Sequence, residues 1–142
     1  MSAYADTSFL VSLYVLDANS VRASTQIKSA KLPILLTAFN EVELTNAFHL
    51  RLFRKEAVAA QIRAAQNLLD EDLESGFFEV RALSSVVFDR ARRLSEKHTP
   101  RLGTRTLDIL HVAAALVLRA DTFYTFDGSQ AKLARAEGLI VA

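Results

Sequence analysis

The sequence predicts an α/β fold in which a mostly parallel β-sheet is covered by helices on both faces. Short apolar segments with strand character alternate with longer segments of helical periodicity, which is the pattern of βαβ units. Residues 34–36 are apolar at every position, as expected of a strand that is buried on both faces. The 142 residues, 51% of them apolar, are enough for a single domain over residues 1–142.

The elements of the first half are set by capping residues and by Pro33. Asp6, Thr7 and Ser8 follow the first apolar segment and can cap a helix. Pro33 restarts the chain before the apolar strand, and Gly76 is expected to end a helix rich in Ala, Gln, Leu and Glu. In order, we expect a strand over 3–5, helices over 9–14 and 20–30, a strand over 34–36, a helix over 39–54 and its continuation over 55–75.

The second half is set by similar signals. Pro100 and Gly103 are expected together in a loop, and the β-branched and aromatic residues over 122–126 indicate a strand. Asp127 can cap a last helix, which Gly138 ends. In order, we expect a strand over 77–80, helices over 84–97 and 106–118, a strand over 122–126, a helix through residue 136 and an edge strand over 139–141.

Composition excludes several kinds of chemistry. There are no cysteines, so disulfides, zinc–thiolate centres and thiol catalysis are excluded. The formal net charge is +1, so any contact with nucleic acid has to come from a local site.

No apolar run approaches the roughly 20 residues of a membrane span, and the N-terminus has no basic region typical of a secretory signal. We expect a cytoplasmic protein without membrane association.

Two acidic residues stand in helices where apolar residues are expected. Asp108 lies in a helix that is apolar nearly all round, where a buried carboxylate needs a cation, a metal, a cleft or a partner such as Arg105. Glu43 shares a helical stripe with apolar residues, from Phe39 to Phe53. Glu41 falls on the other side of that helix, and the spacing favours Glu43 over Glu41 without deciding between them.

Two further acidic residues, Asp6 and Asp127, each follow a short strand and open a helix. Either one is explained by helix capping alone, but the ends of parallel strands meet at one edge of a sheet, where these carboxylates can converge. Four converging carboxylates repel one another unless a hard cation lies between them. Oxygen ligands without cysteine favour Mg²⁺ or Mn²⁺, which serve in phosphodiester hydrolysis.

The sequence resembles the PIN-domain ribonucleases, and within them the VapC-type toxins of toxin–antitoxin pairs. Four segments carry the resemblance, and they are spread over almost the whole chain. The segment around Asp108 is the most specific, and the order and spacing of all four make the match. The segments are Tyr4-Ala5-Asp6-Thr7-Ser8, Glu41-Val42-Glu43-Leu44-Thr45-Asn46-Ala47, the run from Arg105 to Ala115, and Thr125-Phe126-Asp127.

The resemblance implies a three-layer α/β/α sandwich and an Mg²⁺- or Mn²⁺-dependent endoribonuclease that hydrolyses RNA, such as tRNA or rRNA, with metal-activated water. It implies that Asp6 and Asp108 are the principal metal ligands, that Glu43 binds the metal or orients its water, and that Asp127 completes the cluster. Thr7, Ser8 and Thr125 match small hydroxyl residues near that centre. A homodimer and a cognate antitoxin are also implied.

Other residues keep alternative interpretations. His111 can hydrogen-bond Asp108 one turn away, but a packing histidine is the favoured interpretation. Arg105 opens the Asp108 helix beside the expected site. Two arginine-rich runs, at 51–55 and 90–101, either contact the phosphates of RNA or form solvated helix faces. The apolar face of the helix over 55–75 either holds a helix of an antitoxin or packs within the chain.

Two rival functions remain open at this stage. One is a PIN-like platform that binds RNA or protein with little catalysis. The other is an Asp-based phosphoryl-transfer domain, either a receiver or a phosphatase, since both place Asp at a strand end. A phosphatase of that kind needs another Asp where Ser8 stands, and a receiver needs a Lys after a late strand, which the strand over 122–126 lacks.

Overall fold

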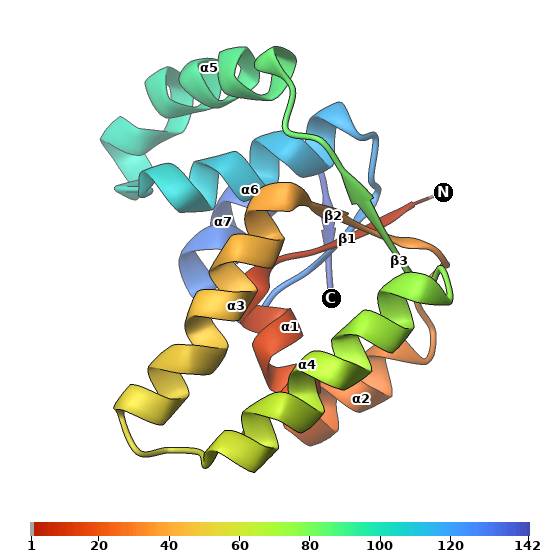
Figure 1. Ribbon diagram of the computed structural model, residues 1–142. Helices are drawn as coiled ribbons and strands as arrows, with labels where there is room; N and C mark the ends of the chain where they lie inside the picture. Colours follow the sequence, from red (N-terminus) through yellow and green to blue (C-terminus); the bar gives the residue numbers. More distant parts are fainter. Residues whose placement is uncertain (1) are drawn as a thin grey trace.

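A computed structural model describes residues 2–142, which pack around one five-stranded sheet (Figure 1). Helices and strands alternate along the chain, as expected. The elements are β1 (Ala3–Ala5), α1 (Thr7–Tyr14), α2 (Ser20–Ile27), β2 (Ile34–Thr37), α3 (Ala38–Phe53), α4 (Ala59–Glu74), β3 (Phe78–Arg81), α5 (Ser85–Leu102), α6 (Thr106–Val117), β4 (Thr122–Tyr124), α7 (Gly128–Ala136) and β5 (Ile140–Val141).

All strand pairs are parallel, and the order across the sheet is β3-β2-β1-β4-β5. β1 lies in the centre, with Ala3 opposite Ile34 of β2 on one side and opposite Thr122 of β4 on the other. The chain winds outward from β1 to β3, then crosses to β4 and winds outward again to β5. The strand order therefore reverses beside β1, and ligands of open α/β sheets bind at such a reversal.

Successive residues of the strands point to opposite faces of the sheet and pack into two separate hydrophobic cores. Ala3 and Ala5 face the core formed with α1 to α4, and Tyr4 between them faces the core formed with α5 to α7. The same alternation separates Leu35 from its neighbours in β2. Figure 1 shows the two groups of helices on opposite faces of the sheet. This confirms the predicted α/β fold with helices on both faces, in the three-layer arrangement that the resemblance implies.

The expected continuous helix from residue 39 to residue 75 is wrong, because α3 ends at Phe53 and α4 begins at Ala59. Lys55 adopts a left-handed conformation with φ of 59°. The Lys55 amide donates to the Leu52 carbonyl, and the Glu56 amide donates to the Arg51 carbonyl. These two bonds form a Schellman end, which usually has glycine where Lys55 stands.

The loop expected around Pro100 is also wrong, because α5 continues through Pro100 to Leu102. Gly103, with φ of 63°, ends the helix and donates its amide to the Thr99 carbonyl. Pro100 lies in the last turn, where the helix is about to end and the cost of its missing amide is confined to one turn. Within residues 2–142, no helix is both long and apolar enough to cross a membrane.

Candidate active site

A hollow of about 490 Å³ lies near the carboxyl ends of β1 and β4, where the strand order reverses. The two strands lead into helices on opposite faces, α1 after β1 and α7 after β4, and this divergence opens the sheet edge. Side chains from α1, α3, α6 and α7 and their caps line the hollow. They are Thr7, Ser8, Glu43, Arg105, Thr106, Leu107, Asp108, His111, Asp127 and Gln130.

Asp6 lies directly after β1 and is fully buried. One carboxylate oxygen accepts hydrogen bonds from the Ser8 hydroxyl, at 2.7 Å, and from the Phe9 amide, at 3.0 Å, and so caps α1. The other accepts a short hydrogen bond from Thr125. Burial raises the pKa of Asp6, although these donors and the His111 charge partly offset it. None of the hydrogen-bond donors is itself a cation, so the site suits a positive ion beside this carboxylate.

Asp108 is buried in the first turn of α6. Its Oδ2 accepts from the Arg105 backbone amide at 3.3 Å, and the Arg105 Nε lies 3.6 Å away. Its Oδ1 accepts from Gln130 Nε2 at 3.2 Å. The capping role and the Arg105 pair are therefore both present, and the same carboxylate also lines the hollow.

Glu43 is half-buried, and it is held by a fully buried histidine. His111 Nε2 lies 2.5 Å from Glu43 Oε1, and the Thr7 hydroxyl donates to the same oxygen at 2.7 Å. Burial favours the neutral form of Glu43, but the hydrogen bond and charge of His111, together with Thr7, outweigh it and lower the pKa of Glu43. Glu43 is therefore held as a carboxylate.

His111 is in turn oriented from behind by Tyr4. The Tyr4 hydroxyl lies 2.8 Å from His111 Nδ1 and 2.9 Å from Asn40 Oδ1, and all three side chains are buried. Asn40 anchors the group by donating from Nδ2 to the Ala5 carbonyl at 3.2 Å. The expectation that His111 packs in the interior holds, but its partners are Glu43 and Tyr4 and not Asp108.

Asp127 caps α7 by accepting a hydrogen bond from the Gln130 amide at 2.9 Å. Its own amide donates to the Thr125 hydroxyl at 2.9 Å, and that hydroxyl is the one that donates to Asp6. Ser8 reaches the same loop by accepting from the Phe126 amide at 3.0 Å. The three small hydroxyl residues named from the sequence therefore lie among the acidic residues.

The apolar stripe proposed for α3 is wrong, although Glu43 lies where expected. Val42 and Phe53 of that stripe are exposed, and the buried side of α3 carries Asn40, Leu44 and Phe48 instead. The core face is thus offset around the helix, which leaves Glu43 at its margin beside α6. This margin explains how Glu43 reaches both solvent and His111.

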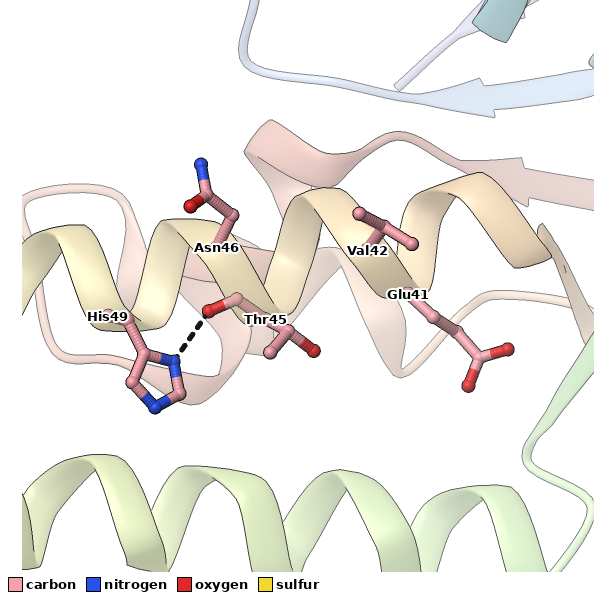
Figure 2. A pocket seen from close by; sticks show the side chains of 5 residues that line it. All are labelled: Glu41, Val42, Thr45, Asn46 and His49. Carbon is pink, nitrogen blue, oxygen red and sulfur yellow. Dashed lines mark hydrogen bonds between the residues drawn. The ribbon is translucent and has the colours of Figure 1, made fainter.

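Glu41 lies outside the hollow. It lines a separate shallow depression on the exposed side of α3 (Figure 2), together with Val42, Thr45, Asn46 and His49. All five residues belong to one helix, and His49 Nδ1 is hydrogen-bonded to the Thr45 carbonyl of its own helix at 2.8 Å. Among residues 2–142, no second element brings another carboxylate to this depression, and Glu43, not Glu41, lines the hollow at the strand-order reversal.

The four acidic residues gather at one sheet edge, but they do not form a compact cluster. Asp6 lies beneath Ser8 and Thr125, while Glu43, Asp108 and Asp127 line the hollow. Within residues 2–142, no three acidic or histidine side chains are close enough together to form a ready metal-binding group. The donor set nevertheless fits a hard divalent cation, because it consists of carboxylates and hydroxyls and includes a buried carboxylate with neutral hydrogen-bond donors.

The sequence did not indicate the roles of three residues at the site. Asn40 and Gln130 were assigned no role, and His111 was expected to pack in the interior, without its contacts to Glu43 and Tyr4. Asn40 had a local signal, because it stands three residues after Thr37 and completes a capping box with it. Gln130 had none, since its contact with Asp108 joins two helices.

The arginine-rich runs have mixed surroundings. Arg51 pairs with Asp17 at 3.2 Å and with Glu56 at 3.4 Å, and Arg90 and Lys97 pair with Glu137 at 3.8 Å and 3.0 Å. These ion pairs favour the interpretation of structural helix surfaces for those residues. Arg105, by contrast, lines the hollow.

The helix α4 buries Ile62, Ala65 and Leu69 against the chain's own core. Leu68, on the same helix, is half exposed. Packing within the chain therefore accounts for most of the apolar face of α4.

A parallel α/β sheet with carboxylates at its strand-order reversal has these groups where open α/β sheets bind their ligands. The profile of the PIN domain family matches residues 3–136, and the chain belongs to this family. The receiver and phosphatase interpretations are therefore set aside. No functionally curated protein matches the sequence.

Several solved structures are similar to the whole fold, including the following three. VapC20 of Mycobacterium tuberculosis, a toxin that cleaves the sarcin–ricin loop, is 19% identical with a TM-score of 0.72, and the match covers 98% of this chain and 97% of VapC20. A toxin–antitoxin complex from Klebsiella pneumoniae is 15% identical with a TM-score of 0.69, covering 98% and 96%. FitAcB from Neisseria gonorrhoeae is 19% identical with a TM-score of 0.68, covering 98% and 95%. These likenesses show the shared fold.

Proposed function

We propose that this PIN-domain protein is an endoribonuclease of the VapC type that depends on Mg²⁺ or Mn²⁺. The observation that carries the proposal is the hollow at the strand-order reversal, with Glu43, Asp108 and Asp127 in its wall and Asp6 beneath it. The membership of the PIN family and the similarity to a toxin that cleaves the sarcin–ricin loop support it.

In this proposal, Asp6 and Asp108 are the main ligands of the metal, Asp127 completes the ligand set, and Thr7, Ser8 and Thr125 orient the carboxylates. When bound, such a metal lowers the pKa of water and neutralises charge on a phosphodiester. Arg105 is 79% exposed at the rim, where its guanidinium can bind a phosphate of the RNA.

Glu43 has a separate role in the proposal. His111 and Thr7 both engage its Oε1, and no hydrogen bond from residues 2–142 engages its Oε2. The carboxylate is therefore fixed at one oxygen and free at the other. The free oxygen can accept a proton from the attacking water or orient it toward the phosphorus.

The test is Asp108→Asn, assayed with a labelled RNA in the presence of Mg²⁺. The substitution keeps the size of the side chain and the acceptor for the Arg105 amide, so the fold should survive. We expect cleavage to fall by at least a hundredfold, since a metal ligand is lost. Asp89→Asn on the exposed face of α5 is the control. Full activity of Asp108→Asn with unchanged circular dichroism would sink the proposal.

The proposal includes an antitoxin partner, a homodimer, and a cytoplasmic location. The similar structure from Klebsiella pneumoniae supports the first, since it is a toxin–antitoxin complex. If calorimetry finds no Mg²⁺ binding while RNA still binds, the protein is instead a PIN-like binding platform.

A further inference from the structure

Three arginines line two hollows that meet the candidate active site at Asp127. Two further hollows, of about 310 Å³ and 370 Å³, adjoin the candidate active site, and all three share Asp127 in their walls. Arg22 and Arg135 line the first, and Arg54 lines the second. Cationic side chains from α2, α7 and the end of α3 thus gather around one loop.

These three guanidinium groups lack an acidic partner. Arg51 nearby pairs with Asp17 and Glu56, but no salt bridge within residues 2–142 involves Arg22, Arg54 or Arg135. Unpaired cations close to one another gain little from the protein itself, and they bind best to a group with several negative charges.

Arg22 is also held in place. Its guanidinium lies over the ring of Phe126, with the central carbon 5.5 Å from the ring centre. The other neighbour of that ring is Phe9, stacked at 5.3 Å. This cation–π contact restrains the guanidinium beside the ring, and the guanidinium fork suits bidentate contact with a phosphate. Phe126 immediately precedes Asp127, so this cation is fixed beside the carboxylate.

We propose that Arg22, Arg54 and Arg135 form a phosphate-binding subsite for the RNA strand on the Asp127 side of the active site. The subsite rests on the proposed nuclease function. RNA then crosses the hollow from Arg105 on one side to the arginine subsite on the other, and the scissile phosphate lies between them. The net charge of +1 hides this arrangement, because paired residues elsewhere balance it.

The subsite is tested by RNA binding in the Asp108→Asn background, which keeps the RNA intact. Fluorescence anisotropy with a fluorescein-labelled single-stranded RNA is measured over a series of KCl concentrations in EDTA. We expect Arg22→Ala, Arg54→Ala and Arg135→Ala each to weaken binding several-fold. Each should also reduce the slope of log K against log salt by about 0.7, the value for one lost phosphate contact on a single strand.

Two further variants sharpen the result. Arg22→Lys keeps the charge but loses the guanidinium fork, so binding should weaken while the salt slope stays unchanged. Arg63→Ala on the exposed side of α4, which lines none of the three hollows, is the control and should bind as the background does. Thermal melting of every variant checks that the fold is retained.

Equal RNA affinity and salt slope in the three alanine variants and in Arg63→Ala would overturn the subsite. Polyglutamate is the probe for an acidic protein partner, and tight polyglutamate binding that depends on Arg22 while RNA binding does not would also overturn it. Cleavage of the same RNA by the unmodified chain with Mg²⁺ is measured separately. Failure of cleavage contradicts the nuclease function, whereas the binding comparison alone decides the subsite.

Discussion

At the scale of residues, the site depends on polar groups that are buried behind it. Tyr4, Asn40 and His111 are each within a few per cent of complete burial, and each is hydrogen-bonded to another. Burial also raises the pKa of Tyr4, which keeps its hydroxyl protonated as a donor. This chain of contacts fixes Glu43 from the interior, so positioning is built into the core.

Removing the Tyr4 hydroxyl tests this chain. Tyr4→Phe retains the ring stacked on Phe123 at 5.6 Å but leaves His111 Nδ1 without its partner. We expect the free energy of unfolding, measured with urea, to fall by about 1–3 kcal/mol, the usual cost of an unsatisfied buried polar group. The turnover number should fall more than the Michaelis constant changes, because Glu43 is displaced. Unchanged stability and turnover would contradict the positioning role.

Asp6, in contrast to Tyr4, is expected to lower the free energy of unfolding. Its folded pKa is raised above the ordinary value of 3.8, mainly by burial. Above the folded pKa, the Asp6 carboxylate is ionised in both the folded and the unfolded state. Its charge is then buried, at a cost in free energy, only in the folded state. Below 3.8 it is protonated in both states and that cost disappears. Asp6 therefore lowers stability at neutral pH.

Asp6→Asn should accordingly stabilise the metal-free protein at pH 7, by about 0.5–2 kcal/mol, while abolishing cleavage. The gain should shrink as the pH falls through the folded pKa, because the native carboxyl is then neutral as well. Urea unfolding at several pH values in EDTA measures this effect, with Asp89→Asn as the control. A loss of stability at pH 7 would show that the hydrogen bonds of Asp6 outweigh its burial.

Local sequence signals identified the acidic residues but not their partners. Asp108 and Glu43 stood out because a carboxylate in an apolar helix is unusual. Their partners His111 and Gln130 were missed because the contacts join residues 68 and 22 positions apart. Spacing along one helix cannot show such contacts, which depend on how the helices pack.

At the scale of elements, some helices end at a residue with positive φ, and this residue is glycine in some cases and not in others. Gly76 and Gly138 were expected as helix stops, and both have positive φ. Lys55 and Arg119 have the same conformation at the ends of α3 and α6, without a glycine to indicate it. Glycine marks a left-handed helix end in the sequence, whereas at Lys55 the same end is formed by two local backbone hydrogen bonds on an exposed residue that is not glycine, which explains the missed break.

A matched pair of substitutions tests this account. Gly76→Ala should destabilise the fold by about 1–2 kcal/mol, because a side chain is disfavoured at positive φ. The added Cβ has no close neighbour, so the effect comes from the backbone conformation and not from a steric clash. Lys55→Gly should stabilise it by roughly 0.5 kcal/mol, because strain is relieved at some entropic cost. Thermal and urea unfolding measure both. The same sign for the two substitutions would contradict the account.

At the scale of the whole molecule, metal binding should be visible as stability. A ligand that binds only the folded state adds RT ln(1 + [L]/Kd), which is about 1.4 kcal/mol at ten times the Kd. Saturating Mg²⁺ should therefore raise the melting temperature by a few degrees. Asp108→Asn should lose this increase, and Asp89→Asn should keep it. An equal increase in all three proteins would mean that the ion acts elsewhere.

The site also joins the two ends of the chain. Asp6 follows the central strand β1, and the hydroxyl that meets its carboxylate belongs to Thr125, 119 residues later. A ribosome therefore has to release the chain as far as Thr125 before β4 can pair with β1 and complete the site. For an enzyme whose proposed substrate is RNA, the translation machinery is in reach during synthesis, yet the growing chain holds no finished centre. The order of synthesis thus delays completion of the candidate site until the segment from β4 to Asp127 has been made.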